Sequence, residues 1–352
     1  RFKKMTKRMK DSSANIIELD KMKIDEQISS YGDFASEGVK IKKWEISNEE
    51  DESKDKYIGI LEKNGCKYSG TLNNKFQKDG YGLEVYDNGD RFFGQYDSDL
   101  RSGNGIYYFA PTQNNENSYN MQVECFMGHW KNDEKDKIGL YIWMDEPINN
   151  YEYDYANFDA YVGEFRDEKY LRGTYLSRKN NEYSLYHGNF DKEGKKNDND
   201  AYFYTSRNNK VFHGKIKGDL LISGYLSSFD DEEGNVTDLI YCKFNEEGKI
   251  NEILEEKQLS TLDIEEEKEK ISKFRNVVFD GDHFGRIYNR YSKIKYKIDK
   301  LGDMIAILER AENVGEIDKI LSKYANKNVY YSLEENLYGR EIYFIVGLKY
   351  LI

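Results

Sequence analysis

Three histidines stand beside regularly spaced glycines, and they are the residues whose chemistry is easiest to name. His187 and His213 each precede a glycine, whereas His129 follows one. Imidazole nitrogens bind zinc at about 2.1 Å. If the glycines mark successive hairpins, equivalent positions lie two strands apart, at about 10 Å for roughly 4.8 Å per strand. Two such histidines cannot share one ion, so we predict no metal site and expect ordinary polar positions for these side chains.

Other short motifs begin like ligand-binding loops but lack essential residues. The GYG segment at Gly80 and the GNG segment at Gly103 have neither the third glycine nor the following helix of a dinucleotide fingerprint. The segment at Asp280 starts like a calcium loop, but Tyr291 stands where the bidentate glutamate belongs. The sequence contains no nucleophile elbow, phosphate loop, zinc-protease or kinase motif. We therefore predict a non-enzymatic protein that uses no cofactor and no metal.

The glycines instead belong to a repeated pattern that predicts β-hairpins. An aromatic residue stands two positions before a glycine, and a second glycine follows that one after 10 to 12 residues in the five units that keep both. Residues two apart share a strand face, and glycine leaves a gap that a ring from a neighbouring strand can cover. The predicted framework is Tyr68, Gly70, Gly80, Gly82, Phe92, Gly94, Gly103, Gly105, Gly128, Gly139, Tyr161, Gly163, Gly173, Tyr186, Gly188, Phe212, Gly214 and Gly224.

Turn signals and insertions separate the units. Asn64-Gly65 and Asn88-Gly89 predict tight turns with positive φ. Polar insertions that begin at Pro111 and at Glu146 account for the longer steps between units. A single hairpin is marginally stable in water, whereas stacked hairpins support one another.

On these residues the units resemble MORN repeats, the membrane occupation and recognition nexus family. The resemblance covers roughly residues 57–244, with its most specific matches in the units of Tyr68 and Phe92. Lys137 stands where the first glycine of a pair belongs, and the pair is absent near Ala201. The resemblance implies a mainly β fold, in which about six to seven hairpins form a single-layer twisted antiparallel sheet. It also implies a scaffold for protein partners or a membrane-associated protein.

The pattern divides the chain into four segments. Residues 1–56 are predicted to form a basic arm, a weakly helical flank and a charged linker, and residues 57–250 the repeat array. Residues 251–327 have the charged, nearly glycine-free texture of helix, and residues 328–352 that of an apolar, strand-like docking tail. Because the ends of a repeat array need covering, capping is the simplest role of both flanks.

A heptad seam runs through the helical segment and is the candidate partner-binding surface. Gly302-Asp303 interrupts it in the way that a helix stop and a new N-cap do. A short helical hairpin packed on the array and a continuous helix paired with a partner both remain open. The seam residues singled out for partner binding are Ile287, Tyr291, Ile294, Ile298 and Leu301.

Charge argues against nucleic acid and anionic membranes as main partners. The chain has 53 Lys and Arg against 65 Asp and Glu, a net charge of −12, whereas such surfaces attract positive charge. Only the arm from Arg1 to Lys10 is strongly basic. It is interpreted as a solvated arm, a contact for an acidic partner, or a targeting segment.

Cysteine usage and hydropathy complete the expectation. The three cysteines are widely spaced without a CxxC motif, which suits a reducing compartment, and no apolar run approaches the roughly 20 residues of a membrane helix. These features favour a cytoplasmic protein, and the resemblance to MORN repeats implies a scaffold subunit of a large complex, in a cilium, an axoneme with its radial spokes, or another part of the cytoskeleton. A peripheral membrane or phosphoinositide-associated adaptor that uses the basic arm is the alternative.

Overall fold

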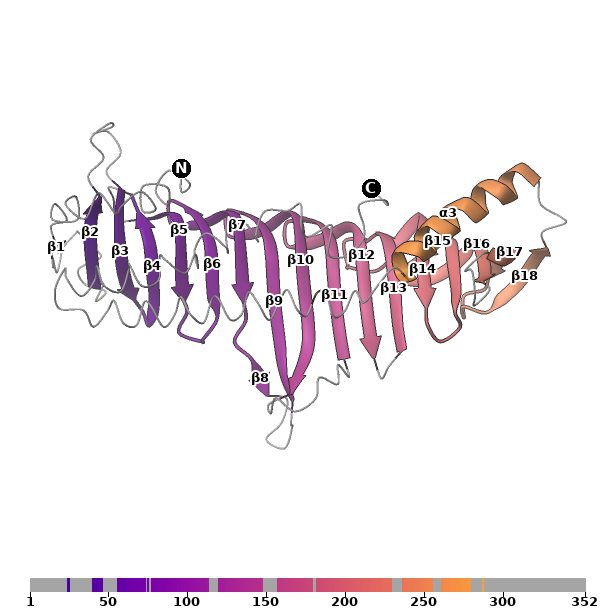
Figure 1. Cartoon of the computed structure of the whole chain (residues 1–352), viewed down its shortest axis with the longest axis horizontal. Coiled ribbons are helices and arrows are strands. Elements are labelled where there is room, and N and C mark those ends of the chain that lie inside the picture. The colour runs from indigo at the N-terminus through magenta and orange to yellow at the C-terminus, as the bar shows by residue number, and fades with distance from the viewer. Residues whose placement is uncertain are drawn as a thin grey trace, which may run out of the picture. The chain divides into compact units, whose positions relative to one another are not determined.

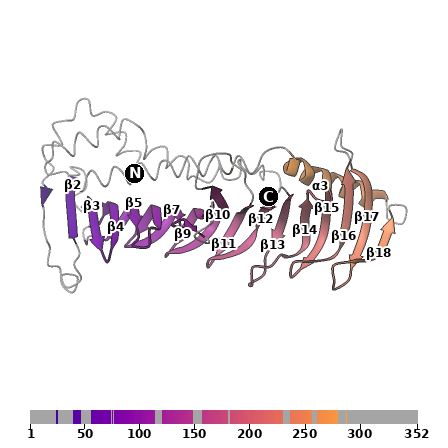
Figure 2. The same cartoon turned by 90° about the horizontal axis from the view of Figure 1, so that it is seen from below.

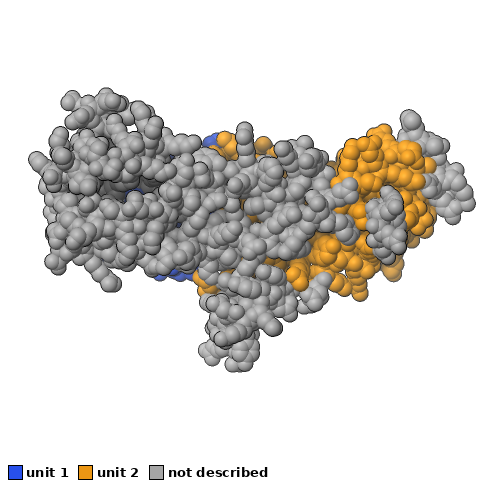
Figure 3. Space-filling model, viewed as in Figure 1, with its two compact units in different colours: residues 1–110, 130–133, 289–338 blue, residues 111–129, 134–288, 339–352 orange. Residues whose placement is uncertain are grey.

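The computed structural model shows a mainly β protein. It describes residues 24–25, 40–46, 56–73, 75, 77–113, 120–147, 157–179, 182–229, 236–255, 261–279 and 287. The chain divides into two compact units (Figure 3). Unit 1 comprises residues 1–110, 130–133 and 289–338, and unit 2 comprises residues 111–129, 134–288 and 339–352.

Unit 1 is built from short antiparallel strands. Each strand pairs with the next, from β1 with β2 through β6 with β7 (Figure 1). The strands are β1 (Ile24–Asp25), β2 (Lys40–Ile46), β3 (Lys56–Lys63), β4 (Cys66–Leu72), β5 (Lys78–Val85), β6 (Arg91–Asp97) and β7 (Leu100–Tyr108).

Unit 2 continues the same hairpin architecture and adds a helix. Consecutive strands from β8 to β18 pair antiparallel. The helix α3 lies against one face near β15 and β17 (Figure 2). The elements are β8 (Thr112–Gln113), β9 (Asn120–Lys131), β10 (Glu134–Pro147), β11 (Asn157–Arg166), β12 (Lys169–Lys179), β13 (Glu182–Asn189), β14 (Asn197–Thr205), β15 (Lys210–Lys217), β16 (Leu220–Phe229), β17 (Val236–Phe244), β18 (Ile250–Glu255) and α3 (Thr261–Phe279).

The framework glycines lie directly opposite one another across their hairpins. A β-carbon on Gly94 would lie 2.6 Å from the Cα of Gly105, so the two backbones approach more closely than any side chain permits. The result is a strip of bare backbone on one face of each sheet. The opposed pairs include Gly70 with Gly82, Gly94 with Gly105, Gly163 with Gly173, and Gly214 with Gly224.

Aromatic rings cover this bare backbone, as predicted, but they come from nearer in the sequence than expected. A β-carbon on Gly82 would lie 2.2 Å from the ring of Tyr68 on the neighbouring strand. The ring of Phe92 blocks Gly105 on the neighbouring strand at 2.3 Å and also Gly94 on its own strand at 2.6 Å. Phe92, Phe126 and Tyr161 therefore each cover the glycine two residues later on their own strand and a glycine on the next strand as well.

The covering rings form the buried core on this side of the sheets. Phe92 and Tyr161 are fully buried and are among the largest such side chains. We call this side of each unit its aromatic face; it carries Tyr68 and Phe92 in unit 1, and Phe126, Tyr161, Tyr186 and Phe212 in unit 2.

Two-residue turns of one backbone type join several hairpins. Asn64 and Gly65 have φ of 51° and 78°, as predicted. The same signature of two positive φ values recurs at residues 98–99, 132–133, 167–168 and 218–219, where the second residue is always acidic. Positive φ at both central positions is typical of type I′ turns, whose twist matches paired strands.

The turn at Asn88-Gly89 is wider. Gly89 has the expected positive φ of 87°. The Tyr86 N–H donates to the Asp90 carbonyl at 2.9 Å, however, and the Asp90 N–H donates to the Asn88 side chain at 2.9 Å. The chain thus reverses over residues 86–90.

The first glycine of each Gly-x-Gly pair has its own backbone role. Gly80 and Gly103 have φ of 96° and 93°, at places where the pairing register with the preceding strand shifts. Lys137 occupies the equivalent place on β10 and also has positive φ, at 54°. The departure from the pattern at Lys137 therefore changes the residue and keeps the backbone conformation.

The flanks differ from the prediction at both ends of the repeat array. Residues 24–25 and 40–46 form strands, although a weakly helical flank was expected from Asp11 to Trp44. β2 pairs along its length with β3, because an unpaired edge of β3 offers backbone groups that a strand satisfies better than a helix. At the other end β18 carries the sheet to Glu255, beyond the expected boundary at residue 250, and α3 begins at Thr261.

The remaining flank predictions fall largely outside the described residues. Of the five predicted partner-binding residues, Ile287 is described; it is helical and buried. Tyr291, Ile294, Ile298 and Leu301 lie outside the described residues, as do the basic arm and residues 328–352.

Candidate functional site

The histidines do not come together. His187 contacts the Thr174 hydroxyl through Nδ1 at 2.9 Å, and burial lowers its pKa to about 4. His129 Nδ1 lies 3.5 Å from an Asp136 carboxylate oxygen, and burial lowers the pKa of His129 as well. Within the described ranges, no group of three His, Cys, Asp or Glu is placed to hold a metal ion.

His213 is more than the polar filler that the pattern predicted. Its Nε2 lies 2.8 Å from an Asp200 carboxylate oxygen, and its Nδ1 contacts the Glu267 carboxylate. The ring also stacks on Tyr202, with 4.0 Å between centroids and 12° between planes. Because Glu267 belongs to α3, this histidine joins the helix to the sheet.

The apolar stripe of α3 completes this junction. Ile264, Ile271 and Phe274 are buried, and Phe274 stacks on Tyr202 with 4.8 Å between centroids. Glu267 follows Ile264 by three residues and precedes Ile271 by four, so it lies in the middle of the stripe. An acid inside an apolar stripe was the sequence signal for a buried polar contact, and it was missed.

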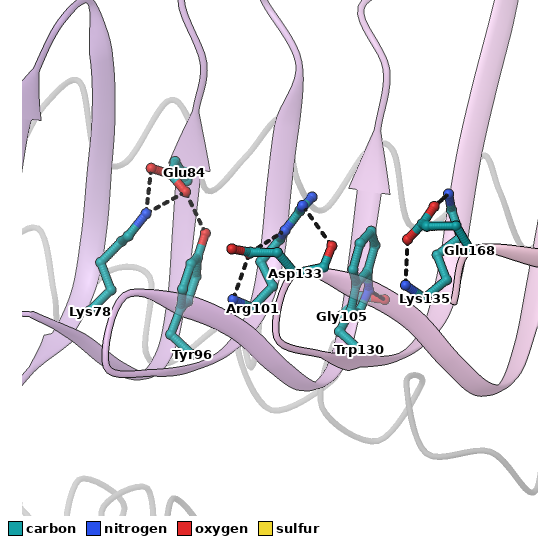
Figure 4. A network of polar contacts seen from close by, with 9 residues as sticks. All are labelled: Lys78, Glu84, Tyr96, Arg101, Gly105, Trp130, Asp133, Lys135 and Glu168. Carbon is teal, nitrogen blue, oxygen red and sulfur yellow. Dashed lines mark hydrogen bonds and ion pairs between the residues drawn. The ribbon is translucent and has the colours of Figure 1, made fainter. Parts of the chain in front are cut away.

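In unit 1, acidic residues of the two-residue turns bind the preceding hairpin. The Lys78 N–H donates to Asp99 Oδ1 at 2.8 Å, and the Asp99 N–H donates back to the Lys78 carbonyl at 2.9 Å. Arg101 and Asp133 repeat this exchange at 2.9 and 3.0 Å. Arg101 adds a side-chain ion pair with Asp133 at 2.9 Å (Figure 4). The turn acids therefore link consecutive hairpins.

Unit 2 uses the same contact. The Lys196 N–H donates to Asp219 Oδ1 and the Asp219 N–H to the Lys196 carbonyl, both at 3.1 Å. Lys135 donates to Glu168 from its backbone and from its ammonium group (Figure 4). Neither side of these contacts belongs to the glycine pattern, so the sequence analysis did not find them.

The linked cations lie over the framework rings. Arg101 lies 4.4 Å from the Trp130 ring centroid, 5.2 Å from Tyr107 and 5.7 Å from Phe92. Lysines take the equivalent position elsewhere: Lys78 over Tyr68 and Tyr96, Lys135 over Phe126 and Tyr141, and Lys196 over Tyr175, Tyr186 and Phe203. These cations therefore stabilise the aromatic face by cation–π contact while their charge is held by an acid.

One carboxylate in unit 1 is buried within such a network. Glu84 is only 7% exposed and accepts from Lys78 Nζ at 2.7 and 2.8 Å (Figure 4). The Tyr96 hydroxyl also donates to it, at 2.7 Å. Burial, followed by the Glu84 charge, raises the pKa of Tyr96 well above its usual value. Glu84 is thus fully engaged inside the protein.

A second acidic group lies on the aromatic face of unit 2. The Tyr141 hydroxyl donates to the Glu124 carboxylate. Trp143 stacks on Tyr141, with 4.1 Å between centroids and 26° between planes, and lies opposite Asp159 on β11. We call the set Glu124, Tyr141, Trp143, Asp159, Tyr170 and Tyr175 the tyrosine–carboxylate cluster.

The electrostatics of this cluster are strongly negative. Burial is the largest cause of the raised pKa of Tyr170, and the neighbouring tyrosines and the charges of Glu124 and Asp159 raise it further. Burial and then Asp159 raise the pKa of Tyr175 in the same way. The tyrosines therefore stay protonated, and two carboxylates carry the local charge.

The carboxylate of Asp159 forms a hydrogen bond with Tyr175 but leaves one oxygen unsatisfied among the described residues. Its Oδ1 is buried and has no hydrogen-bond partner among the residues for which the structure gives positions. A buried carboxylate oxygen without a donor is costly, and native proteins rarely leave one unexplained. The cluster thus has the chemistry to accept a cation or a hydrogen-bond donor.

Comparison with known proteins does not assign the chain to a family. No model of a known protein family matches the chain, and no curated protein matches it. Over the described residues, no helix is long and apolar enough to cross a membrane.

Proposed function

We propose that this chain is a non-catalytic scaffold of MORN-like repeats that binds protein partners through its aromatic face. The observation that carries the proposal is the tyrosine–carboxylate cluster of unit 2, where Trp143 and Tyr175 are half-buried beside carboxylates. Tyrosine and tryptophan supply large, rigid contact area together with a polar group, and they are enriched where proteins bind one another.

The aromatic residues of this face fall into two classes, one that serves the fold and one that is available for binding. The framework rings such as Phe92 and Tyr161 are fully buried over the glycines and serve the fold. Trp143, Tyr175 and Phe203 lie on the same face but remain partly exposed. The fold does not require these three rings to be partly exposed, so we attribute their exposure to partner binding.

The same charges favour a protein partner over a lipid surface. Glu124 and Asp159 place negative charge on the aromatic face, and anionic headgroups repel such a surface. We place the scaffold in a cytoskeletal assembly, such as a ciliary axoneme with its radial spokes, because the repeats resemble those found there.

Affinity isolation of the tagged full chain from its own cells tests the proposal. The wild type is compared with a Trp143→Ala, Tyr175→Ala double variant and with an Ile253→Ala control. Ile253 is 50% exposed on β18, away from the cluster in sequence. We expect the wild type and the control to retain at least one protein about tenfold better than the double variant does. Removal of an aromatic anchor weakens binding by about that factor. Identical protein sets for all three would contradict the proposal.

Localisation of the tagged chain tests the placement separately. Signal along cilia or the cell cortex is expected. A plasma-membrane or mitochondrial signal without ciliary or cortical staining would contradict the cytoskeletal placement, and would leave binding through the aromatic face to be judged by the isolation experiment.

A further inference from the structure

The tyrosine–carboxylate cluster of unit 2 contains the same kinds of side chain as a site in unit 1 that already holds a guanidinium group. In unit 1, Arg101 Nε lies 2.9 Å from an Asp133 carboxylate oxygen, and its guanidinium carbon lies 4.4 Å from the Trp130 ring centroid. A tyrosine, Tyr107, lies 5.2 Å away on another side. A carboxylate, an indole and a phenol therefore surround one guanidinium within this protein.

The cluster supplies the same three groups without a guanidinium. Asp159 lies directly opposite Trp143 on the paired strands β10 and β11, and it raises the pKa of nearby Tyr175. In the described part of the chain, no cation lies over the Trp143 ring. Lys135 lies 5.1 Å from the Tyr141 ring, and its ammonium group is bound to Glu168.

The buried oxygen of Asp159 indicates what is missing. Its lack of a hydrogen-bond partner is what an arginine would correct, because a guanidinium carries five N–H donors in a plane. The plane of Trp143, which stacks on Tyr141, gives that guanidinium an aromatic surface.

Among the described residues, the tryptophan that has a cation over its ring holds an arginine. Arg101 lies over Trp130 as well as over Tyr107 and Phe92, whereas Lys78, Lys135 and Lys196 lie over tyrosine and phenylalanine rings. A flat, weakly hydrated guanidinium stacks on an indole better than a compact ammonium does. The indole of Trp143 therefore favours arginine.

We propose that the tyrosine–carboxylate cluster binds an arginine side chain of a protein partner, with Asp159 as its carboxylate and Trp143 as its stacking surface. This inference rests on the proposed scaffold function and names the chemistry of the partner. The acidic net charge of the chain favours a basic partner segment in the same direction.

Peptide binding to the full chain tests the assignment. The probe is a fluorescein-labelled peptide with four arginines spaced by glycine and serine, and the matched peptides carry lysine or uncharged citrulline at the same four positions. Fluorescence anisotropy gives the dissociation constants, and the change in tryptophan emission that is lost in Trp143→Leu reports contact with Trp143. We expect the arginine peptide to bind about tenfold more tightly than the lysine peptide and the citrulline peptide to bind more weakly still.

Two variants separate the site from the general charge of the chain. Asp159→Asn removes one charge inside the cluster, and Asp238→Asn removes one from an exposed position on β17 of the same unit. We expect the first to raise the dissociation constant about tenfold and the second by less than about twofold, since one charged hydrogen bond is worth about that much. Trp143→Leu should weaken binding and reduce the preference for arginine over lysine. Circular dichroism confirms that each variant is folded.

Several outcomes would overturn the assignment. Equal effects of the two Asp→Asn changes would show that only the overall charge attracts the peptide, and absence of measurable binding would exclude the site. Removal of residues 1–10 should change the affinity little; a gain of about tenfold would show that the chain's own basic arm occupies the cluster. If the isolation experiment finds cluster-dependent partners but the arginine peptide does not bind, the scaffold proposal stands and the arginine assignment fails.

Discussion

The carboxylate of Glu267 on α3 contacts Nδ1 of His213 on β15, and both side chains are buried. The other ring nitrogen of His213 lies 2.8 Å from Asp200. His213 thus links Glu267, which lies 54 positions later on α3, to Asp200, which lies 13 positions earlier on β14. Capping of the sheet by α3 depends on this polar contact as well as on apolar burial.

Glu267→Gln should loosen α3 while leaving the hairpins intact. The substitution keeps the shape of the side chain and removes the charge that His213 contacts, at a cost of about 1–3 kcal/mol for a buried charged hydrogen bond. Hydrogen exchange should become faster in residues 261–279 and stay unchanged in β10 to β12. Glu266→Gln is the matched control, because Glu266 is exposed and pairs with Lys270 at the surface. Equal exchange in the two variants would contradict the role of Glu267.

Lys137→Gly should stabilise the protein. Lys137 is exposed and has φ of 54°, a conformation that costs an L-residue about 1–2 kcal/mol and glycine almost nothing. We expect the unfolding free energy to rise by roughly 1 kcal/mol in urea denaturation. Lys169→Gly on β12 is the control: Lys169 is also exposed but is not among the positive-φ residues, so glycine there should destabilise. A loss of stability in both variants would show that the backbone at Lys137 is not strained.

Gly94→Ala should be far more harmful than Gly194→Ala. The new β-carbon at Gly94 would lie 2.6 Å from both Gly105 Cα and Phe92 Cζ, so backbone and ring must both move. Gly194 has φ of 80° but nothing within 4 Å, so alanine there meets only the backbone penalty. Thermal unfolding should show a loss of about 3 kcal/mol or more for Gly94→Ala and about 1 kcal/mol for Gly194→Ala. Similar losses would mean that the close approach of the strands is not what requires glycine at position 94.

His187 should make the protein sensitive to mild acid. Burial lowers its pKa to about 4 in the folded protein, against about 6.5 in the unfolded chain. The unfolded chain then binds more protons between these values, so the stability contribution is fully present above pH 6.5 and is lost as the pH falls toward 4. His187→Gln should remove roughly 2.5 kcal/mol of the stability difference between pH 7 and pH 4.5, which denaturation curves at the two pH values measure. The same slope in both proteins would show that other groups cause the acid sensitivity.

The hairpins could be predicted from the sequence because they depend on local rules. Glycine two residues after an aromatic, repeated at fixed spacing, predicts paired strands with a ring over bare backbone, and the ring of Phe92 against Gly94 and Gly105 confirms it. Lys137 shows the limit of residue identity as a guide, since it keeps a glycine-like φ of 54° without being glycine. The resemblance to MORN repeats, the scaffold function and the cytoskeletal placement remain proposals.

The strands of the flanks were missed because no local rule predicts them. β2 and β18 form where the neighbouring strand offers an unpaired edge, and such an edge exists only once the hairpins are assembled. The turn acids were missed for a similar reason. Asp133 follows Arg101 by 32 residues, and nothing in its immediate sequence shows that it will bind there.

The sequence by itself determined the period and the strand faces, because strand alternation acts over a few residues. Only the tertiary structure decided which acids meet which cations and rings. Asp159 and Trp143 are 16 positions apart and become direct neighbours through the pairing of β10 with β11. His213 and Glu267 meet because α3 returns to the sheet. These contacts depend on how the strands pair and how the helix packs. The number of residues between two positions in the sequence does not show whether their side chains will touch.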